Sequence, residues 1–461
     1  MYFNVGRHYS HFFNCTLNKQ IIMNTKISNR ALKPPMGWNS WDCFGTNVTE
    51  DEVKENANFI ANNLKQFGWE YVVVDLGWYG TEIDNHNYKT ENIPQLIDDY
   101  GRLIPDPIRF PSSINGAGFK PLADYIHGLG LKLGIHIMRG IPVQAVQQKS
   151  KVKGTNLTAD QISYDRERCP WFNSLRTLDF SKPETQAYYD SIFEMYAGWG
   201  VDYIKADDVN AWSEVHRSSG SPTGEGSPYR IDDIEGMAKA IDNSGRDIVF
   251  SISPGGPETT IINHLRNNAN LWRISADFWD EWGSLKMQMN RCATWAPFVT
   301  AGHWPDADML PLGDLPRGES GGTNRVSNFT NDEQTTVMTL WSMFRSPLMF
   351  GGNLPKTSEF TISLISNEEV LEVNQNSWNN RLLKGNEEEK IWIAENEKGI
   401  YFALFNISDE EREITMNFSD VNCNDEVTVR DLWKKGNLGN YTTSFSAKVA
   451  PHGAKMYLIS K

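Results

Sequence analysis

The chain has 461 residues, of which 39% are hydrophobic and 22% are charged, the composition of an ordinary globular protein. Its 58 acidic residues outnumber the 44 basic ones, and the net charge of −14 argues against nucleic acid or an anionic membrane as a partner. No apolar run is long enough to span a bilayer, and residues 1–22 lack the apolar core of a signal peptide. The compartment stays open between the cytoplasm and the periplasm, and we expect residues 1–30 to be a leader, ordered or disordered, outside the folded domains.

The five cysteines are odd in number and form no C-x-x-C pair. A disulfide framework or a zinc site is therefore not expected, and buried free thiols are. His127 and His136 are too few for the His-rich site of a metal-dependent barrel hydrolase, so we expect no metal. No pattern in the chain indicates an oligomeric state.

From residue 31 to residue 373, short apolar runs alternate with helical patterns. The helix expected at Glu50–Phe67 begins with a capping box of Thr49 and Glu52, and the one at Pro183–Trp199 begins with a proline. Several apolar runs are continuous, as in strands buried on both faces, and eight strands with intervening helices predict an α/β fold, a (β/α)8 TIM barrel. The expected strands are Met36–Trp41, Tyr71–Asp75, Leu131–Ile137, Val201–Asp207, Asp247–Ser253, Leu271–Asp277, Phe298–Ala301 and Pro347–Gly351.

From residue 374 to residue 461, short segments rich in β-branched and aromatic residues are separated by turn residues, without a helical period. This pattern predicts a C-terminal antiparallel β-sandwich domain. It carries no catalytic constellation, so we expect a stabilising role, with glycan binding as the alternative. Its expected strands are Lys390–Ala394, Gly399–Asn406, Glu413–Phe418, Glu426–Asp431, Tyr441–Ala447 and Lys455–Ile459.

Two aspartates, Asp207 and Asp277, end two of the barrel's strand-like segments. The C-terminal ends of barrel strands meet at one rim, where a pair of carboxylates is the minimum equipment for double-displacement cleavage of a glycosidic bond. Lys205 shares a strand face with Asp207, and we expect it to lower the pKa of Asp207 and keep this nucleophile ionised. Arg273 lies on the same alternating side as Asp277, either as a ligand to substrate or as the partner of another rim carboxylate.

The other predicted strand ends also carry polar side chains, and tryptophans are concentrated among them. Carboxylates and cations hydrogen-bond sugar hydroxyls, while indole rings lie against the C–H faces of a sugar ring. This mixture indicates a carbohydrate site. Besides Lys205 and Arg273, its candidate substrate-binding residues are Trp41, Asp75, His136, Ser253 and Asp308.

Several motifs, in the same order along the chain, make it resemble glycoside hydrolase family 27 of the α-galactosidase clan from residue 32 onward. They are Pro34-Pro-Met-Gly-Trp-Asn-Ser-Trp41, Tyr203-Ile-Lys-Ala-Asp207, Trp272-Arg-Ile-Ser-Ala-Asp277, Asp306-Ala-Asp-Met-Leu310, Leu340-Trp-Ser-Met-Phe-Arg-Ser-Pro-Leu348, and Val429-Arg-Asp-Leu-Trp433 through Val449-Ala-Pro-His-Gly453.

The resemblance implies a retaining, exo-acting hydrolase of α-galactosidase type that acts on non-reducing ends of oligosaccharides or polysaccharides and needs no cofactor. Asp207 would be the nucleophile and Asp277 the acid/base. The residues implied to hold the sugar in the −1 subsite are Trp41, Asp75, Lys205, Arg273 and Asp308.

The residues expected to read the sugar depart from the family pattern. Typical α-galactosidases end the second strand with two adjacent aspartates that grip the O4 and O6 side of galactose, and here the pair is Asp75-Leu76. His136 replaces a tyrosine, Ser253-Pro254 replaces a Glu-Trp pair, and Asp208-Val209 stands where many members have a cysteine.

Losing a hydrogen-bond partner for a hydroxyl can change discrimination by orders of magnitude, so the sugar stays open. The alternatives are a β-L-arabinopyranoside, an α-N-acetylgalactosaminide or an isomaltose-type α-glucan. His136 and Arg139 either restore the lost contacts or read another sugar. A non-catalytic carbohydrate-binding barrel and a metal-dependent hydrolase are the alternatives from other classes.

Overall fold

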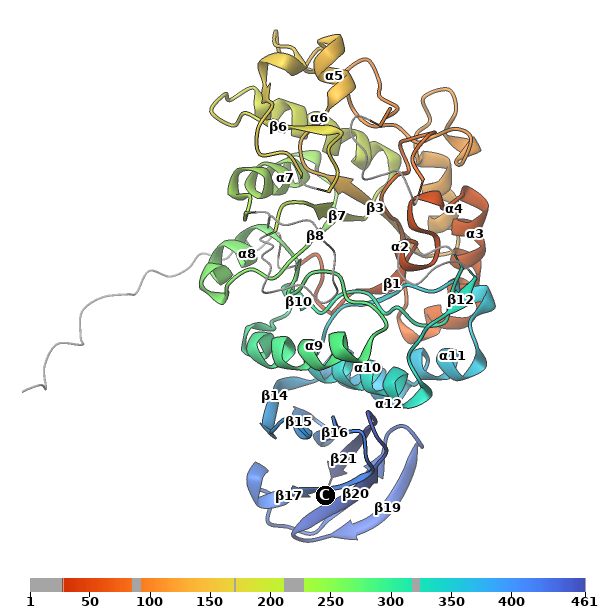
Figure 1. The fold of residues 1–461 in the computed structure, drawn as a ribbon, viewed down its shortest axis with the longest axis vertical. Helices are drawn as coiled ribbons and strands as arrows, with labels where there is room; N and C mark the ends of the chain where they lie inside the picture. The colour runs from red at the N-terminus through yellow and green to blue at the C-terminus, as the bar shows by residue number, and fades with distance from the viewer. Residues whose placement is uncertain are drawn as a thin grey trace, which may run out of the picture.

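The computed structural model describes residues 27, 29–84, 93–169, 171–210, 228–316 and 324–460 (Figure 1). Most of the expected leader, residues 1–26 and 28, lies outside the described residues. The carbonyl oxygen of Ile27 accepts a hydrogen bond of 2.8 Å from Asn270, and the Arg30 guanidinium forms an ion pair with Asp242. Two residues from the end of the expected leader therefore contact the barrel.

Within the described ranges, eight parallel strands form one sheet in the order β10-β9-β8-β7-β3-β2-β1-β13. Leu310, just after β10, pairs in parallel with Phe350 of β13, and its amide donates to the carbonyl of Met349 over 2.8 Å. This bridge joins the two edges of the sheet, and the predicted (β/α)8 barrel is confirmed. The strands are β1 Met36–Asn39, β2 Tyr71–Val74, β3 Lys132–Met138, β7 Tyr203–Asp207, β8 Val249–Ile252, β9 Leu271–Arg273, β10 Trp304–Asp306 and β13 Leu348–Phe350.

Helices surround the strands (Figure 1). The predicted capping box is present, since Thr49 accepts from the amide of Glu52 and the Glu52 carboxylate accepts from the amide of Thr49. The expected helix there begins as α3 and continues through a π turn, Ile60–Leu64, and a 3-10 turn, Lys65–Phe67. The helices are α2 Trp41–Phe44, α3 Glu50–Phe59, α4 Lys120–Gly128, α5 Val143–Gln148, α6 Thr185–Trp199, α7 Ile231–Ser244, α8 Ile262–Asn268, α9 Trp282–Trp295, α10 Asn331–Phe344, α11 Glu359–Ile365 and α12 Glu368–Asn376.

Short strands decorate the barrel between its main elements. One small sheet follows β3, and a second pair precedes α10. The first sheet consists of β4 Ile141–Pro142, β5 Ser163–Tyr164 and β6 Leu175–Leu178, and the second of β11 Asp314–Leu315 and β12 Arg325–Val326.

The seventh barrel strand was predicted in the wrong place. Phe298 ends a 3-10 turn that begins at Ala296, and the strand is β10, in which Trp304 pairs with Leu271 of β9. Pro305 lies inside β10, and a proline argues against a central strand because it has no N–H to donate. It is tolerated here because the strand order places β10 at one end of the sheet.

The predicted β-sandwich is confirmed, and Figure 1 shows it in blue beside α10 and α12. A six-stranded sheet, in the order β14-β15-β16-β21-β18-β19, packs over the pair β17-β20 within residues 378–460. The single strand expected at Tyr441–Ala447 is wrong, because Tyr441 ends β19 and β20 begins at Ser444. The strands are β14 Trp378–Gly385, β15 Glu389–Asn396, β16 Gly399–Asn406, β17 Arg412–Asn417, β18 Val427–Asp431, β19 Gly436–Tyr441, β20 Ser444–Val449 and β21 Ala454–Ser460.

The thiols are as expected where they are described: Cys43, Cys169 and Cys292 are free and buried, and Cys423 is free and half-buried. Cys15 lies outside the described residues. In the described part of the chain, no helix combines the length and the apolar character needed to cross a membrane.

Candidate active site

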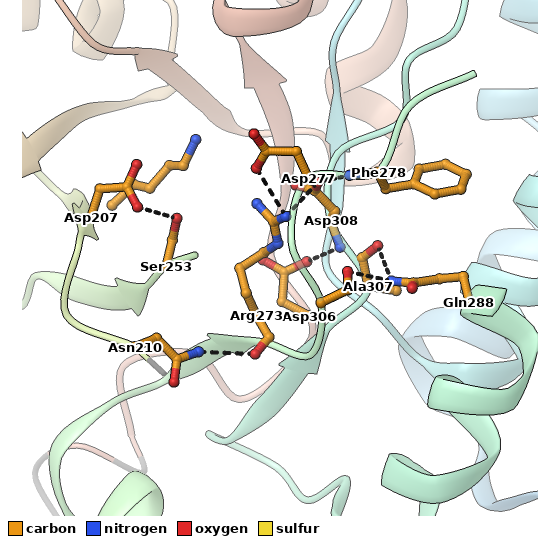
Figure 2. Close-up of polar contacts among 12 residues, drawn as sticks. Asp207, Asn210, Ser253, Arg273, Asp277, Phe278, Gln288, Asp306, Ala307 and Asp308 are labelled. Atoms are coloured by element: carbon orange, nitrogen blue, oxygen red, sulfur yellow. Dashed lines mark hydrogen bonds and ion pairs between the residues drawn. The ribbon is translucent and has the colours of Figure 1, made fainter. Parts of the chain in front are cut away.

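Apart from Trp41, the side chains selected from the sequence as catalytic or substrate-binding come together at the C-terminal ends of the barrel strands, in two groups. One group surrounds Asp207 at the end of β7, and the other surrounds Asp277 after β9. Figure 2 shows Asp207 with Ser253 in the first group, and Asp277 with Arg273 and Asp308 in the second.

Asp207 is held by three hydrogen-bonding contacts and is 9% exposed. Its Oδ2 lies 3.1 Å from Nε2 of His136, and its Oδ1 accepts from the Ser253 hydroxyl over 2.9 Å and from the Asp208 amide over 3.0 Å. Burial opposes ionisation, but the hydrogen bond and charge of His136, then Lys205 and Ser253, hold the pKa of Asp207 below its ordinary value. These contacts favour the ionised form of the Asp207 carboxylate.

Lys205 lowers the pKa of Asp207 as expected, but the carboxylate that it contacts directly is that of Asp75. The Lys205 ammonium donates to Oδ2 of Asp75 over 2.9 Å, and the side-chain amide of Asn39 donates to the same oxygen over 2.8 Å. Burial opposes the charge on Asp75, yet Lys205 and His136 keep the pKa of Asp75 below its usual range. Burial also opposes the charge on Lys205, but Asp75, Asp207 and Asp308 raise the pKa of Lys205. The main partner of Asp207 is thus His136, with Lys205 acting on it at longer range.

The second group centres on the guanidinium of Arg273. Its Nη2 lies 3.2 Å from Oδ1 of Asp277 and 2.7 Å from Oδ2 of Asp308, so Arg273 is a partner of rim carboxylates. The Asp277 side chain is 52% exposed and so is open to solvent. Asp308 is 6% exposed and also accepts from the Phe278 amide over 2.7 Å. Burial raises the pKa of Asp308 to about 7. The charge of Arg273 opposes this rise, and the charges of Asp277 and Asp306 add to it.

Side chains behind the rim hold this second group in place. The side-chain amide of Gln288, from α9, donates to the backbone carbonyl of Ala307 over 2.8 Å. The side-chain amide of Asn210 donates to the backbone carbonyl of Arg273 over 3.0 Å (Figure 2). Gln288 also donates to the Ser275 hydroxyl over 3.0 Å, so α9 contacts both the loop that carries Asp277 and the segment that carries Asp308.

Two expected residues have a different setting from the sequence prediction. Trp41 opens α2 rather than ending β1, and its amide donates to the Asn39 side chain over 2.9 Å. Arg139 is 3% exposed, and its guanidinium donates to the carbonyl of Asp208 over 2.9 Å and to Thr177 over 3.0 Å. Arg139 therefore supports the backbone after Asp207. It does not take the place of the sugar-binding aspartate that typical family members have at the position of Leu76.

Two residues beside the selected ones were missed, Asn39 and Asp42. Asn39 lies inside the first motif of the resemblance, which was the signal for it, whereas Asp42 directly follows the last residue of that motif. Asn39 orients Asp75, and Asp42 is a buried carboxyl on the same rim. Among the described residues, no group of three or more His, Cys, Asp or Glu side chains is arranged to hold a metal ion.

The family comparison matches both parts of the chain. The model described as "Alpha galactosidase A" matches residues 33–150 and 177–376, and the "Alpha galactosidase C-terminal beta sandwich domain" model matches residues 386–459. A barrel with a carboxylate-lined rim, followed by this sandwich, defines a glycoside hydrolase. The chain belongs to glycoside hydrolase family 27, the α-galactosidase family.

Its relatives act on more than one sugar. The β-L-arabinopyranosidase of Geobacillus stearothermophilus, solved in complex with arabinose, is 45% identical, with a TM-score of 0.89 over 94% of this chain and 99% of its own. A candidate α-N-acetylgalactosaminidase from Bacillus halodurans is 41% identical, with a TM-score of 0.79 over 93% and 97% of the two chains. Alpha-galactosidase 2 of Arabidopsis thaliana is 27% identical, over 96% of this chain and 92% of the plant protein.

Proposed function

We propose that the protein is a retaining, exo-acting glycosidase in which Asp207 is the nucleophile and Asp277 the acid/base. The carboxylate of Asp207 attacks the anomeric carbon while the glycosidic C–O bond breaks, and Asp277 gives its proton to the leaving oxygen. Water then attacks the glycosyl-enzyme ester, returns a proton to Asp277 and frees the Asp207 carboxylate. The observation that carries this assignment is the contrast between a buried Asp207, held ionised, and a half-exposed Asp277.

We further propose a terminal β-L-arabinopyranoside as the preferred substrate, ahead of the α-galactoside implied by the resemblance. β-L-Arabinopyranose has the ring and hydroxyl arrangement of α-D-galactopyranose without the hydroxymethyl group. Leu76 follows Asp75 directly and is 2% exposed, so an apolar side chain stands where typical family members grip the O6 side. A site without a polar partner for O6 suits a sugar without that hydroxyl. The 45% identity to a β-L-arabinopyranosidase supports the same choice.

An aryl-glycoside panel tests the substrate. Purified protein is mixed with nitrophenyl β-L-arabinopyranoside, α-galactoside, α-N-acetylgalactosaminide and α-glucoside, and nitrophenol release is followed. The expected result is the highest kcat/KM on the β-L-arabinopyranoside, with slower turnover of the α-galactoside. Preferential turnover of any other glycoside would overturn the choice of sugar while leaving the glycosidase mechanism in place.

Two further measurements test the mechanism. Proton NMR of the first-formed sugar should show the anomeric configuration of the substrate, and the opposite anomer would exclude double displacement. Asp207→Asn should remove turnover without abolishing folding, whereas a non-catalytic barrel would show no turnover in either protein. Activity that survives prolonged chelation would exclude the metal-dependent alternative.

A further inference from the structure

A buried ion pair that the proposed mechanism does not use lies directly behind the nucleophile. Arg139 follows β3 and Asp208 follows β7, the neighbouring barrel strand. Asp208 is fully buried, Arg139 is 3% exposed, and Nε of Arg139 lies 2.8 Å from Oδ2 of Asp208. Burying two charges costs free energy that their attraction offsets only in good geometry, so a pair in this place calls for a specific explanation.

The pair surrounds the peptide group that joins Asp207 to Asp208. The backbone amide of Arg139 donates to the carbonyl of Asp207 over 3.2 Å, and Nε of Arg139 donates to the carbonyl of Asp208 over 2.9 Å. The N–H of the same peptide group, that of Asp208, donates to Oδ1 of Asp207 over 3.0 Å. Arg139 therefore holds the backbone that supplies one of the hydrogen bonds to the nucleophile.

The backbone of Asp208 has an uncommon conformation that this hydrogen bond depends on. Its φ is 59°, in the left-handed region that glycine adopts freely and that aspartate and asparagine adopt more readily than other residues. A flip of the peptide group that returned φ to negative values would turn the amide of Asp208 away from the Asp207 carboxylate. Contacts that hold the Asp208 side chain and carbonyl oppose this flip.

The far end of the Arg139 guanidinium is also fixed. Its Nη1 donates to the Thr177 hydroxyl over 3.0 Å, and its Nη2 donates to the carbonyl of Glu167. Burial opposes the charge on Arg139, but Asp208 and then Asp233 raise the pKa of Arg139, so the guanidinium stays charged. Arg139 is therefore a fixed cation that anchors Asp208, with Asp233 as a second anion that acts on it.

We propose that the Arg139–Asp208 ion pair positions the nucleophile, by keeping the Asp208 amide on Oδ1 of Asp207 and so holding the carboxylate in place for attack on the anomeric carbon. The inference rests on the proposed glycosidase function and adds two positioning residues to it. Both act through Asp207 and not through contact with the sugar. The pair lies where the chain departs from the family pattern, since Asp208-Val209 stands where many members have a cysteine.

The first test separates kcat from KM on the best substrate of the panel. Asp208→Gly keeps the left-handed conformation accessible but removes the carboxylate, and Arg139→Gln removes the cation. Each should lower kcat about 10- to 100-fold, because a displaced nucleophile reacts slowly, and should leave KM within about twofold of wild type. Asp208→Asn keeps an acceptor for Arg139, and Arg139→Lys keeps the charge, so each should recover part of the lost kcat.

A double variant and a matched control separate positioning from general disturbance. Asp208→Gly/Arg139→Gln should show a kcat no lower than that of the slower single variant, because the two residues act as a unit. Arg230→Gln is the control, since the Arg230 guanidinium binds the same Glu167, at its carboxylate over 2.6 Å and at its carbonyl over 3.3 Å. It should keep the wild-type kcat, even if the melting temperature falls.

All rates are measured well below the lowest melting temperature of the set. Wild-type kcat in folded Asp208→Gly and Arg139→Gln proteins would overturn the inference, as would a rise in KM alone or an equal fall of kcat in Arg230→Gln. If the glycine or glutamine variant does not fold, Asp208→Asn and Arg139→Lys decide, and wild-type kcat in both would overturn the inference.

These results leave turnover by the wild-type protein intact, so they are distinguishable from failure of the proposed function. A wild-type protein that cleaves no glycoside of the panel would overturn both.

Discussion

Nε2 of His136 lies 3.1 Å from Oδ2 of Asp207, across the neighbouring strands β3 and β7. The same nitrogen lies 4.0 Å from Oδ1 of Asp75, while Nδ1 of His136 has no hydrogen-bond partner among the described residues. One imidazole therefore stands between the proposed nucleophile and the carboxylate that pairs with Lys205. Its hydrogen bond and its charge are the largest influences that favour ionisation of Asp207.

His136→Leu should move the acidic limb of the kcat/KM profile to higher pH. The nucleophile must be ionised, and removing His136 raises the pKa of Asp207, so a larger fraction of the enzyme is inactive in acid. The loss of a hydrogen bond to a charged group predicts a fall in kcat/KM of about 10- to 100-fold at the acidic end. His136→Gln keeps a hydrogen-bond donor without the charge, so the acidic limb of its kcat/KM profile should lie between those of wild type and His136→Leu. A limb that is identical in His136→Leu and wild type would assign the ionisation of Asp207 to another group.

Asp308 should make stability depend on pH. Its pKa rises from the ordinary 3.8 to about 7 in the folded protein, so the folded state binds its proton more tightly than the unfolded state. The stabilisation is complete below pH about 4 and is lost as pH rises through about 7. Asp308→Asn removes this dependence, so the melting temperature of wild type minus that of the variant should shrink between pH 4 and pH 8. A difference that stays constant or grows would show that Asp308 is ionised throughout.

Leu76→Asp should shift preference toward α-galactosides. The ratio of kcat/KM for the α-galactoside to that for the β-L-arabinopyranoside is expected to rise about tenfold or more, because O6 gains a partner. The new carboxylate is buried beside Asp75, so the melting temperature should fall. Leu76→Ala is the matched control, since it makes room for a hydroxymethyl group without supplying a partner. An equal shift in Leu76→Ala would mean that Leu76 acts by its volume alone.

The barrel and its rim were predictable because local patterns report them directly. Buried parallel strands appear as apolar runs, and the capping box at Thr49 marks a helix start. Once eight strands are placed, the convergence of their C-terminal ends brings Asp207 to the same rim as His136 and Ser253, whatever the spacing in the chain. Each of these steps needs only the order of the elements.

The specific pairings were not predictable, since each joins residues on different elements. The Lys205–Asp75 ion pair spans 130 positions. Strand periodicity placed Lys205 beside Asp207, but it could not show which of the two carboxylates, Asp75 or Asp207, Lys205 contacts. The missed strands β14 and β19 are polar and largely exposed at the two edges of their sheet, so they lack the alternation that marks a half-buried strand. The Arg139–Asp208 ion pair likewise joins residues at the ends of two strands, and no local pattern reports it.

His452 should anchor the sandwich to the barrel. Its ring stacks on Trp282 at the start of α9, with centroids 4.0 Å apart, and its Nδ1 and Nε2 lie 2.8 Å from Glu333 of α10 and from Asp409. Its carbonyl also accepts from Thr336 of α10 over 2.7 Å. His452→Ala should lower the free energy of unfolding by about 1–2 kcal/mol, the sum of a ring contact and a charge-assisted hydrogen bond at a partly exposed site.

The measurement is thermal unfolding, with limited proteolysis to detect early release of the sandwich. His452→Phe keeps the stacking on Trp282 and loses both polar contacts, so its melting temperature should lie between those of wild type and His452→Ala. Trp282 lies five residues after Asp277 in the chain, so looser packing here should also lower kcat at temperatures near the transition while leaving it unchanged well below. A fall in kcat at low temperature, without loss of stability, would instead mean that His452 orders the Asp277 loop directly.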